Sequence, residues 1–419
     1  IMLVNGRVSG SPGKNVSITS IGAGPNVDSG GRLRVSENKT LKSGTHHYGI
    51  DPDLFRTLEI NTGAITYDAN ANEAILTAAS SGDRAVLQSA QYIRYQPGKG
   101  QLIKGTANFK STGTGIFSVV QRSNTSGTVI DTRINQADFN ADSIDGNGNS
   151  GVNIDFDKAG YFYIQFLHLG VAPVVFGMMS QEGILFECHK FKNPSQNVNM
   201  WAAFATLPFR VEIINIGTNI IKRMGYFDDT NGIFWEMVES DLSKNTFNHL
   251  CYAVESEGGS DVDDEAGIPT SASTGSTVIA VGATLIPLIS IRPKQTFQGK
   301  DFRGSLIPTN ANVTSSRRDL YCVVLKNATL TGPSWTSRGA DSIMEFDVSS
   351  TAISGGQVIA EFHVIEDSSF GLTKTTTQSQ IELVNDILNT NSDTLTIAAQ
   401  NTAGAANALA VMGAKELRG

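Results

Sequence analysis

The sequence predicts an all-β protein, with a β-sandwich or jelly-roll-like main domain and a second, smaller β domain. Charged residues make up only 17% of the 419 residues, whereas hydrophobic residues make up 40%. The 42 glycines are about 10% of the chain, above the usual ~7%. Short apolar runs closed by Gly, Asn, Asp or Pro recur along the chain. Such a composition disfavours long surface helices and suits strands that are joined by tight turns.

We expect five segments along the chain. Residues 1–59 form a Gly/Ser/Asn-rich N-terminal arm, which is poorly able to bury a core alone. Residues 60–256 form the large β-sandwich. Residues 257–276 carry the chain's only acidic run and a low-complexity stretch, which is typical of a linker. Residues 277–365 form the smaller β domain, and residues 366–419 form a C-terminal extension.

The large domain contains closely spaced segments that alternate or run apolar, and none of them shows a convincing helical period. About a dozen short strands at this spacing favour a sandwich or a jelly roll. The strand candidates are 74–79, 84–95, 101–109, 115–122, 127–134, 161–167, 172–178, 183–191, 208–216, 220–227, 232–238 and 247–255.

The smaller domain shows the same kind of pattern. Pro287 and Pro293 place the strand at 285–291 at a sheet edge or at a bulge, because proline cannot donate to a strand ladder. In the C-terminal extension, apolar spacing over Gln378–Leu388 predicts one short helix, and 394–399 predicts a final strand. The strand candidates of the smaller domain are 278–281, 285–291, 320–326, 343–348 and 357–364.

Charge and cysteine content exclude several classes of partner. The 40 acidic and 32 basic residues give a formal net charge of -8. A sequence pI near 5.3 argues against nucleic-acid binding, which needs a clustered basic face. We expect no membrane span, because the longest uncharged apolar stretch, 170–179, is too short. Cys188, Cys251 and Cys322 are widely spaced and odd in number, so neither a disulfide framework nor a zinc pattern is implied.

An Asp- and Asn-rich stretch is the candidate for a metal site. Oxygen ligands at alternate positions suit a hard cation such as Ca2+. The candidate ligands are Asp142, Asp145, Asn147 and Asn149. An EF-hand loop does not fit, because Ser150 and Phe156 stand where its glycine and its bidentate glutamate belong. The alternative is a pair of Asn/Gly turns without a metal, and we expect no other cofactor.

Two tryptophans, Trp201 and Trp235, are candidates for a carbohydrate-binding platform. Aromatic residues in alternating strands suit a hydrophobic core equally well, and the aromatic content of 8% shows no excess to explain. Both a carbohydrate-binding role and a core role stay open.

Two sets of acidic residues fit the two-carboxylate pattern of a glycoside hydrolase. They are Glu182 with Glu187, and Asp228 and Asp229 with Glu236. Acidic residues at strand ends are usually solvated, and the chain has no G-x-S-x-G nucleophile motif. We therefore expect a protein that is not an enzyme.

Several short strings stand out between about residue 84 and about residue 365. They are YQPGK at Tyr95–Lys99, DTRINQADFN at Asp131–Asn140, DGNGNSG at Asp145–Gly151, LPFRVEI at Leu207–Ile213 and CYAVESEGG at Cys251–Gly259. Taken together, they resemble a family of virion structural proteins of marine tailed phages and large algal DNA viruses. The strings are turns and strand edges, so the resemblance supplies no active site.

One string departs from the order that this family shows. The family's GYFD–NGIFFE hairpin corresponds here to Gly225–Glu236, which follows LPFRVEI. In the family's usual place, the hairpin would pair between the strands at 101–109 and 115–122. To reach that place, the chain would need a long connection from Asn219 into the hairpin and another from the hairpin to Asn245. Short connections would instead indicate that the hairpin segment is displaced from the family's order.

The resemblance implies a virion structural protein that acts in the virus particle, by self-assembly and by packing onto the shell or tail. The implied partners are copies of this chain, with a trimer as one form, and other capsid or tail proteins. The arm and the extension would reach neighbouring subunits. One alternative is an attachment protein that binds a host surface glycan through Trp201 or Trp235. Another is a glycan-cleaving enzyme that depends on Glu236.

Overall fold

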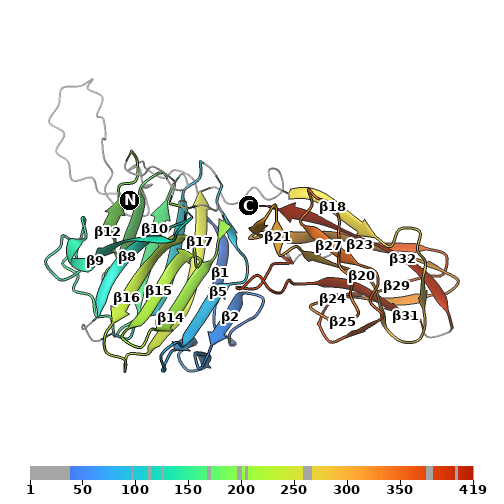
Figure 1. Ribbon diagram of the computed structural model, residues 1–419, viewed down its shortest axis with the longest axis horizontal. Helices are drawn as coiled ribbons and strands as arrows, with labels where there is room; N and C mark the ends of the chain where they lie inside the picture. Colours follow the sequence, from blue (N-terminus) through green and yellow to red (C-terminus); the bar gives the residue numbers. More distant parts are fainter. Residues whose placement is uncertain are drawn as a thin grey trace, which may run out of the picture.

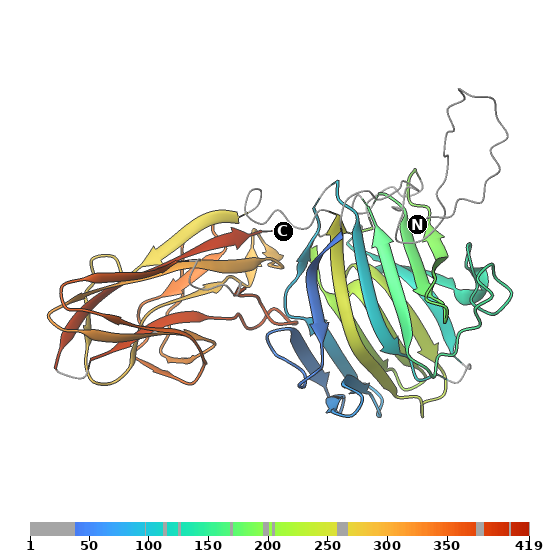
Figure 2. The ribbon, with the colours of Figure 1, turned by 180° about the vertical axis from the view of Figure 1, so that it is seen from behind.

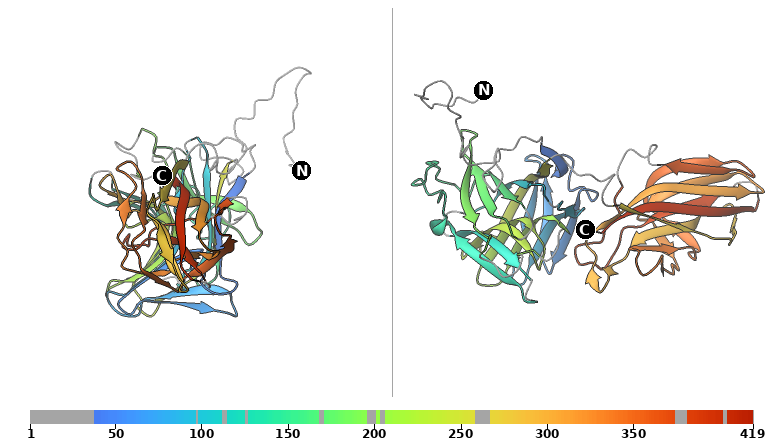
Figure 3. Two further views of the ribbon diagram at one scale, coloured as in Figure 1. Left: turned by 90° about the vertical axis from the view of Figure 1, so that its right-hand side faces the viewer. Right: turned by 90° about the horizontal axis from the view of Figure 1, so that it is seen from above.

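The computed structural model describes residues 38–96, 98–111, 115–124, 127–167, 171–195, 201–202, 206–257, 267–373, 381–401 and 404–418. Within these ranges the protein is all-β, as predicted, and its single helical turn is the 3-10 turn η1 (Gln136–Asp138). No helix in the same ranges is long and apolar enough to cross a membrane. Two β-sandwich domains lie end to end (Figures 1 and 3).

The N-terminal domain consists of two antiparallel sheets, each named after one of its strands. The β17 sheet contains, in order, β12 (Leu185–Phe191), β11 (Val174–Met179), β10 (Gly160–Phe166), β7 (Gln101–Asn108), β17 (Thr246–Glu257), β4 (Glu73–Thr77) and β3 (Ala64–Asp68). The β15 sheet contains β2 (Phe55–Ile60), β5 (Arg84–Ser89), β14 (Phe209–Asn215), β15 (Ile220–Phe227), β16 (Gly232–Glu239), β8 (Ile116–Ser123) and β9 (Ile130–Asn135). A short ladder joins β6 (Ile93–Arg94) to β13 (Thr206–Leu207). Figure 1 shows the β15 sheet in front, and Figure 2 shows the β17 sheet.

Alternation along each strand sends one set of side chains into a core between the two sheets. In β16, Trp235 and Met237 point inward, while Phe234 and Glu236 point to the outer face. Aromatic rings fill much of this core, and Trp235 stacks on Phe117 with 5.3 Å between ring centroids. The burial of this apolar surface is the main favourable term in the stability of the domain.

Strand β1 (Asn38–Thr45) shares one edge of β17 with β4. The first residues of β17, up to His249, pair with β4, whereas Cys251 and the residues after it pair with β1. At this change of partner, His46 Nε2 lies 2.9 Å from His249 Nδ1, and both side chains are buried. Strand β1 is therefore an integral part of the sandwich.

The C-terminal domain is a second antiparallel sandwich. The β32 sheet contains β18 (Gly267–Ser273), β32 (Ala406–Leu417), β23 (Ser305–Ser316) and β30 (Ser369–Thr373), with β19 (Ile279–Val281) also beside β32. The β31 sheet contains β26 (Thr336–Ser337), β27 (Met344–Asp347), β20 (Ile286–Pro293), β31 (Leu395–Gln400), β24 (Leu320–Lys326) and β29 (Gln357–Val364). Two short ladders pair β21 (Thr296–Phe297) with β22 (Lys300–Asp301), and β25 (Thr329–Thr331) with β28 (Ala352–Ser354).

Small and aliphatic side chains fill the core of the C-terminal domain. Ala408 and Ala410 of β32 belong to the same buried cluster as Ile289 of β20. The ladder between β20 and β31 shifts register between Pro287 and Ile289. The bulge that its prolines predict is therefore present, and it lets a proline-containing strand lie inside a sheet.

The domains take in much of the predicted arm, linker and extension, so three predicted boundaries are corrected. We predict a linker over 257–276, but β18 lies within it and pairs with β32 in the C-terminal sandwich, while residues 258–266 lie outside the described ranges. We predicted an arm over 1–59, but β1 and β2 are strands of the N-terminal sandwich, and residues 1–37 lie outside the described ranges. We predicted an extension over 366–419, but β31 and β32 are inner strands of the C-terminal sheets. The alternation of apolar and polar residues is weak at the predicted arm and extension, so the sequence does not reveal these strands. Pairing with neighbouring strands stabilises them instead.

The predicted helix Gln378–Leu388 does not form in its described part, residues 381–388. Leu383 instead makes an isolated β-bridge to Leu306, and it is fully buried in the core of the C-terminal domain. Burial of the apolar residues against the sheets outweighs their helical spacing. The remainder of the predicted helix lies outside the described ranges.

The string Gly225–Glu236 forms the turn and inner part of the β15–β16 hairpin. This hairpin lies between β14 and β8, and β7 belongs to the opposite sheet, so it does not pair between the strands at 101–109 and 115–122. Asp228 shapes the turn, because its Oδ1 accepts hydrogen bonds from the backbone N–H groups of Thr230 and Asn231. The connections that lead into and out of the β15–β16 hairpin, 216–219 and 240–245, are short, which is the result expected if this segment is displaced from its place in the family. The hairpin nevertheless pairs with a neighbouring strand on each side.

Charged contacts join the two domains at their facing ends. Two of the acidic partners, Glu382 and Asp393, lie in residues 381–394, which precede β31 and extend from the C-terminal domain toward the N-terminal one (Figure 1). The contacts are Lys42 with Glu382 at 2.5 Å, Arg56 with Asp393 at 2.6 Å, Lys326 with Asp53 at 2.7 Å, and Arg303 with the hydroxyl of Tyr92 at 2.7 Å.

Candidate functional site

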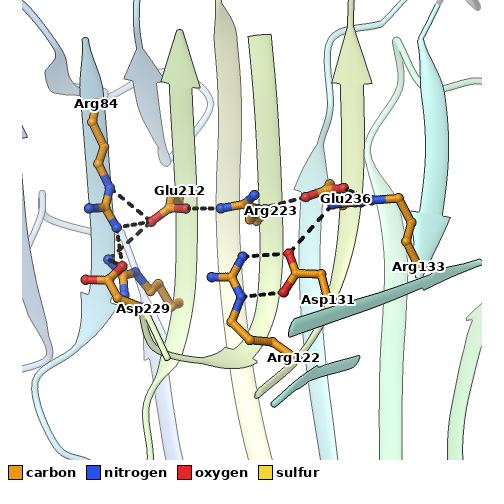
Figure 4. Close-up of polar contacts among 9 residues, drawn as sticks. Arg84, Arg122, Asp131, Arg133, Glu212, Arg223, Asp229 and Glu236 are labelled. Atoms are coloured by element: carbon orange, nitrogen blue, oxygen red, sulfur yellow. Dashed lines mark hydrogen bonds and ion pairs between the residues drawn. The ribbon is translucent and has the colours of Figure 1, made fainter. Parts of the chain in front are cut away.

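A row of alternating charges crosses the outer face of the β15 sheet (Figure 4). Strand pairing places Glu212 of β14 opposite Arg223 of β15, and Arg223 opposite Glu236 of β16. Arg84 of β5 and Arg133 of β9 complete the row at its two ends. The signs therefore alternate from one edge of the sheet nearly to the other.

Glu212 is held by several arginines at once. Its Oε2 accepts hydrogen bonds from Arg84 Nε at 3.2 Å and Nη2 at 2.6 Å, and its Oε1 accepts one from Arg223 Nη1 at 3.0 Å. Arg210 Nη2 lies 3.1 Å from Oε2, and only 1% of Glu212 is exposed. Burial alone would raise the pKa of Glu212, but Arg210, Arg84 and Arg223 together lower it to about 2. Glu212 is therefore an anion at ordinary pH.

Glu236 is 0% exposed, and both of its oxygens are occupied. Oε1 accepts a hydrogen bond from Arg133 Nε at 2.6 Å, and Oε2 accepts one from Arg223 Nε at 2.8 Å. Arg133 reaches across β8 because the residue opposite Glu236 on that strand, Ser118, is small. A two-carboxylate hydrolase needs an accessible carboxylic acid that donates a proton. Glu236 does not provide one.

Asp131 and Asp229 form further ion pairs beside this row. Arg122 donates from Nε and Nη2 to the two oxygens of Asp131, at 2.7 and 2.9 Å, in a bidentate pair. The same guanidinium lies over the ring of Phe234, 5.1 Å from its centroid. Asp229 is 50% exposed and pairs with Arg84. The arginine side chains of this face therefore cover an outward apolar ring of the sheet, that of Phe234.

The N-terminal domain has a pocket of about 740 Å³. The segments that line it lie at the end of this domain that faces away from the C-terminal domain (teal and green in Figure 2). Its walls are the loop that follows η1 and the turn between β11 and β12. Glu182 and Glu187, one of the two acidic sets named from the sequence, both line this pocket. Two of the four predicted calcium ligands, Asp142 and Asn149, also line the pocket, whereas Asp145 does not.

Asp142 organises the loop that forms one wall of the pocket. Its Oδ1 accepts a hydrogen bond from the N–H of Ile144 at 2.9 Å, and its Oδ2 accepts one from the N–H of Ser150 at 2.7 Å. Gly148 permits this closure, since a Cβ at this position would lie 2.2 Å from Asp142 Oδ1. The N–H of Asp142 donates to the carbonyl of Cys188, which ties the loop to β12.

The predicted calcium ligands act as turn-forming residues. Asp145 Oδ1 accepts hydrogen bonds from Ser143 Oγ and from the N–H of Asn147, at 2.8 and 2.9 Å. Both oxygens of Asp142 are likewise taken by backbone amides. In the described part of the chain, no group of three or more His, Cys, Asp or Glu side chains could hold a metal ion. These hydrogen bonds are those of the Asn/Gly turns that were the alternative to a calcium site.

Trp201 and Trp235 lie in the core, and each is 1% exposed. Trp201 meets Phe166 edge to face at 5.9 Å, and Trp235 is enclosed by Phe117 and other rings. Neither ring presents a face to solvent on which a sugar could stack. The carbohydrate-binding role that we predicted for these two residues is corrected to the core role that was its alternative.

Most of the charged row is not apparent from the sequence. The available signal is an arginine or glutamate at an outward position of several strands, as at Glu212, Arg223 and Glu236. Which strands become neighbours depends on long-range pairing, and that pairing decides whether such residues meet.

No protein-family model matches the chain, and no curated protein matches it. A Bacillus subtilis protein of unknown function with a galectin-like fold is similar at 10% identity, over 53% of this chain and 97% of that one, with a TM-score of 0.20. The exoplasmic/lumenal domain of VIP36, in a Ca2+/Man3GlcNAc-bound form, shares 9% identity over 52% and 89%, with a TM-score of 0.26. An endo-1,3-beta-glucanase from Streptomyces sioyaensis shares 9% over 53% and 95%, with a TM-score of 0.19. The assignment of a β-sandwich rests on the strand pairing described above.

Proposed function

We propose that this chain is a structural protein of a virus particle that works through its surfaces and not by catalysis. The strings that resemble virion structural proteins support the location. The observation that carries the non-enzymatic part is the ion pairing of Glu212 and Glu236. Glu212 stays ionised at ordinary pH, and arginines occupy both oxygens of Glu236, so neither serves as a general acid.

The composition and the domain arrangement also support a role in assembly. With charged residues at only 17% of the chain, strand-rich surfaces can be covered by other subunits at little desolvation cost. Two sandwiches joined end to end give an elongated body (Figure 3) that presents such surfaces along its length.

Light scattering of the full chain and analysis of purified particles test this proposal. We expect light scattering to show a homo-oligomer at micromolar concentration. We also expect gold labelling to place the chain at a defined position on the virus particle. A strictly monomeric chain that is absent from the particle would overturn the proposal.

Carbohydrate binding, as part of attachment to a host surface, is the second candidate function. The pocket between the loop after η1 and the turn of β11–β12 favours it, because amide and carboxylate side chains line a concave site beside apolar ones. A glycan array probed with the full chain tests this role, and we expect binding to at least one glycan. A chain that binds none would remove this candidate.

A further inference from the structure

We infer that this pocket selects neutral or amine-bearing sugars and rejects acidic ones. The inference rests on the carbohydrate-binding role proposed above and specifies the ligand class of the pocket. It follows from four properties of the pocket: walls held by hydrogen bonds, exposed polar side chains, the sign of its charge, and apolar side chains beside the polar ones.

Hydrogen bonds hold both walls of the pocket in place. The side chain of Asn140 exchanges two hydrogen bonds of 2.9 Å with the backbone of β12, beside the tie between Asp142 and Cys188. In the opposite wall, the N–H of Ser180 donates to the carbonyl of Ile184 at 2.8 Å, and the N–H of Ile184 donates to Ser180 Oγ at 3.2 Å. A site with fixed walls loses less conformational entropy when a ligand binds.

Four solvent-exposed polar side chains line the pocket and make no hydrogen bond to any residue in the described ranges, so a ligand can replace the water around them. They are Asn149, Asn153, Gln181 and Glu182. An amide both donates and accepts hydrogen bonds, and a carboxylate accepts them, so together they match the hydroxyl groups of a sugar. A purely apolar ligand would take these groups out of water without replacing their hydrogen bonds.

The charge of the pocket has one sign. Its acidic lining residues are Asp142, Glu182 and Glu187, and none of the lining residues is Lys, Arg or His. A uronate, a sialate or a sulfate would meet these carboxylates without a compensating cation. An amine-bearing sugar would be attracted by the same charges, and a neutral sugar would not be repelled.

Apolar side chains complete the match to a sugar ring. Ile184, which is 59% exposed, lies in the wall together with Phe186 and Val152. Sugar rings carry C–H groups beside their hydroxyls, and these pack against apolar side chains. The volume of about 740 Å³ falls within the roughly 300–1,000 Å³ of small-molecule sites.

A glycan array followed by titration calorimetry on the full chain tests the inference. The array carries neutral, amine-bearing, carboxylated and sulfated glycans, and the best binder is then compared with its carboxylated analogue. We expect the carboxylated analogue to bind at least about tenfold more weakly, because it adds a like charge near the pocket carboxylates. Acidic glycans that bind as tightly as neutral ones would overturn the inference.

Two variants connect the binding to this pocket. Glu182→Gln removes one charge while keeping the shape, so we expect it to reduce discrimination against the acidic analogue severalfold. The double substitution of Asn149→Ala with Gln181→Ala should weaken every bound glycan about tenfold or more, since it removes two partners for hydroxyl groups. Glu366→Gln, a matched change on the C-terminal domain, should leave both quantities unchanged.

The outcomes separate this inference from the carbohydrate-binding role itself. If glycans bind and the double variant has no effect, the sugar site lies elsewhere, which refutes the inference and leaves the role standing. If no glycan binds, both fail. Thermal unfolding of each variant confirms that the loop substitutions leave the fold intact.

Discussion

The two domains share one architecture but differ in the side chains that they bury. The N-terminal domain packs aromatic rings such as Trp235 and Phe117 between its sheets, whereas the C-terminal domain packs alanines of β32 against aliphatic residues. The N-terminal domain also buries the ionisable side chains of Glu212, Lys222 and His249. Their folded-state pKa values depart from the ordinary ones, so the stability of this domain is coupled to pH.

The shifted carboxylates of the C-terminal domain belong to a different type. Burial would raise the pKa of Asp347, but hydroxyl groups of Ser349 and Ser350 and backbone amides lower it. Hydrogen bonds from Asn391 and Thr390 lower the pKa of Asp386 in the same way. Because aspartates titrate near pH 4, these two carboxylates change the stability of the domain only below about pH 4. The comparison predicts that changes of pH between 4.5 and 8.5 affect the N-terminal domain far more than the C-terminal one. Above that range the buried thiol of Cys322, whose pKa burial raises to about 12, makes the C-terminal domain pH-dependent as well.

The largest effect is expected from Glu212→Gln. A neutral amide leaves Arg84, Arg210 and Arg223 around a site that has lost its anion, which costs about 3–5 kcal/mol of unfolding free energy. Hydrogen exchange with mass spectrometry, resolved by domain, measures the loss in the N-terminal domain. The control is Glu345→Gln in the partly exposed pair with Arg292, where we expect less than about 1 kcal/mol. Equal losses in the two variants would contradict the prediction.

The same carboxylate predicts an acid-dependent loss of stability. The pKa of Glu212 is about 2 in the fold and 4.5 ordinarily, so the unfolded chain takes up this proton at higher pH than the folded chain. Its contribution is complete above pH 4.5 and is lost as the pH falls from about 4.5 to 2. Denaturation at pH 5, 4 and 3 should show this loss in the wild type, and Glu212→Gln should lack this part of it.

Lys222 predicts a dependence at alkaline pH. The side chain points into the core, where Nζ donates to the carbonyl oxygens of Phe109 and Lys110. Burial lowers the pKa of Lys222 from 10.5 to about 7, so above pH 7 the unfolded chain holds a proton that the folded chain does not. Stability therefore rises with pH from 7 toward 8.5, by up to about 1.4 kcal/mol per unit, below the range in which the buried thiol of Cys188 opposes it. Lys222→Met should flatten this slope in urea denaturation, and a slope equal to that of the wild type would contradict the assignment.

Local patterns predicted the strands well where apolar alternation and flanking turns agree. The predicted strands 220–227 and 357–364 coincide with β15 and β29 at both ends. In contrast, β23 and β32 escaped prediction, because their Ser, Asn, Ala and Gly residues have low strand propensity. These two strands pair along most of their length, and each lies between partners that supply its ladder.

The candidate sites show the same limit. Asp142, Glu182 and Glu187 could be selected from the sequence as acidic residues, but their convergence on one pocket depends on how the loop after η1 packs against β12. Burial was the other unknown. A strand pattern suits a core tryptophan and a surface one equally, so only the pairing of the sheets decides that Trp201 is covered.

The buried pair of His46 and His249 predicts a pH dependence at one place in the N-terminal domain, the edge of β17 where β1 and β4 meet. Burial lowers the pKa of His46 from 6.5 to about 4 and that of His249 well below 6.5, and their neighbours are the rings of Phe55, Phe209 and Tyr252. Protonation thus favours the unfolded state, and stability is lost as the pH falls from 6.5 to 4, by about 1–3 kcal/mol.

Exchange rates of the β1 amides measure this effect, because the pair lies where β17 changes partner from β4 to β1. We expect protection in β1 to fall between pH 6.5 and 4.5 in the wild type. The substitution His46→Phe should reduce this dependence, whereas His363→Phe on the exposed face of the C-terminal domain should not. If both variants keep the full dependence, the histidine pair is not its source.

The smallest effect is expected at the contacts between the domains. The pair of Lys326 and Asp53 joins a largely buried ammonium to a half-exposed carboxylate, and such pairs contribute about 0–1 kcal/mol. A double-mutant cycle of Lys326→Ala and Asp53→Ala should give a coupling energy in this range. Since the contacts are weak, calorimetry should resolve two unfolding transitions, of which only the N-terminal one moves strongly between pH 4.5 and 8.5. A single transition that shifts as a whole with pH would instead make the two sandwiches one cooperative unit, and the buried charges of one domain would then govern the stability of both.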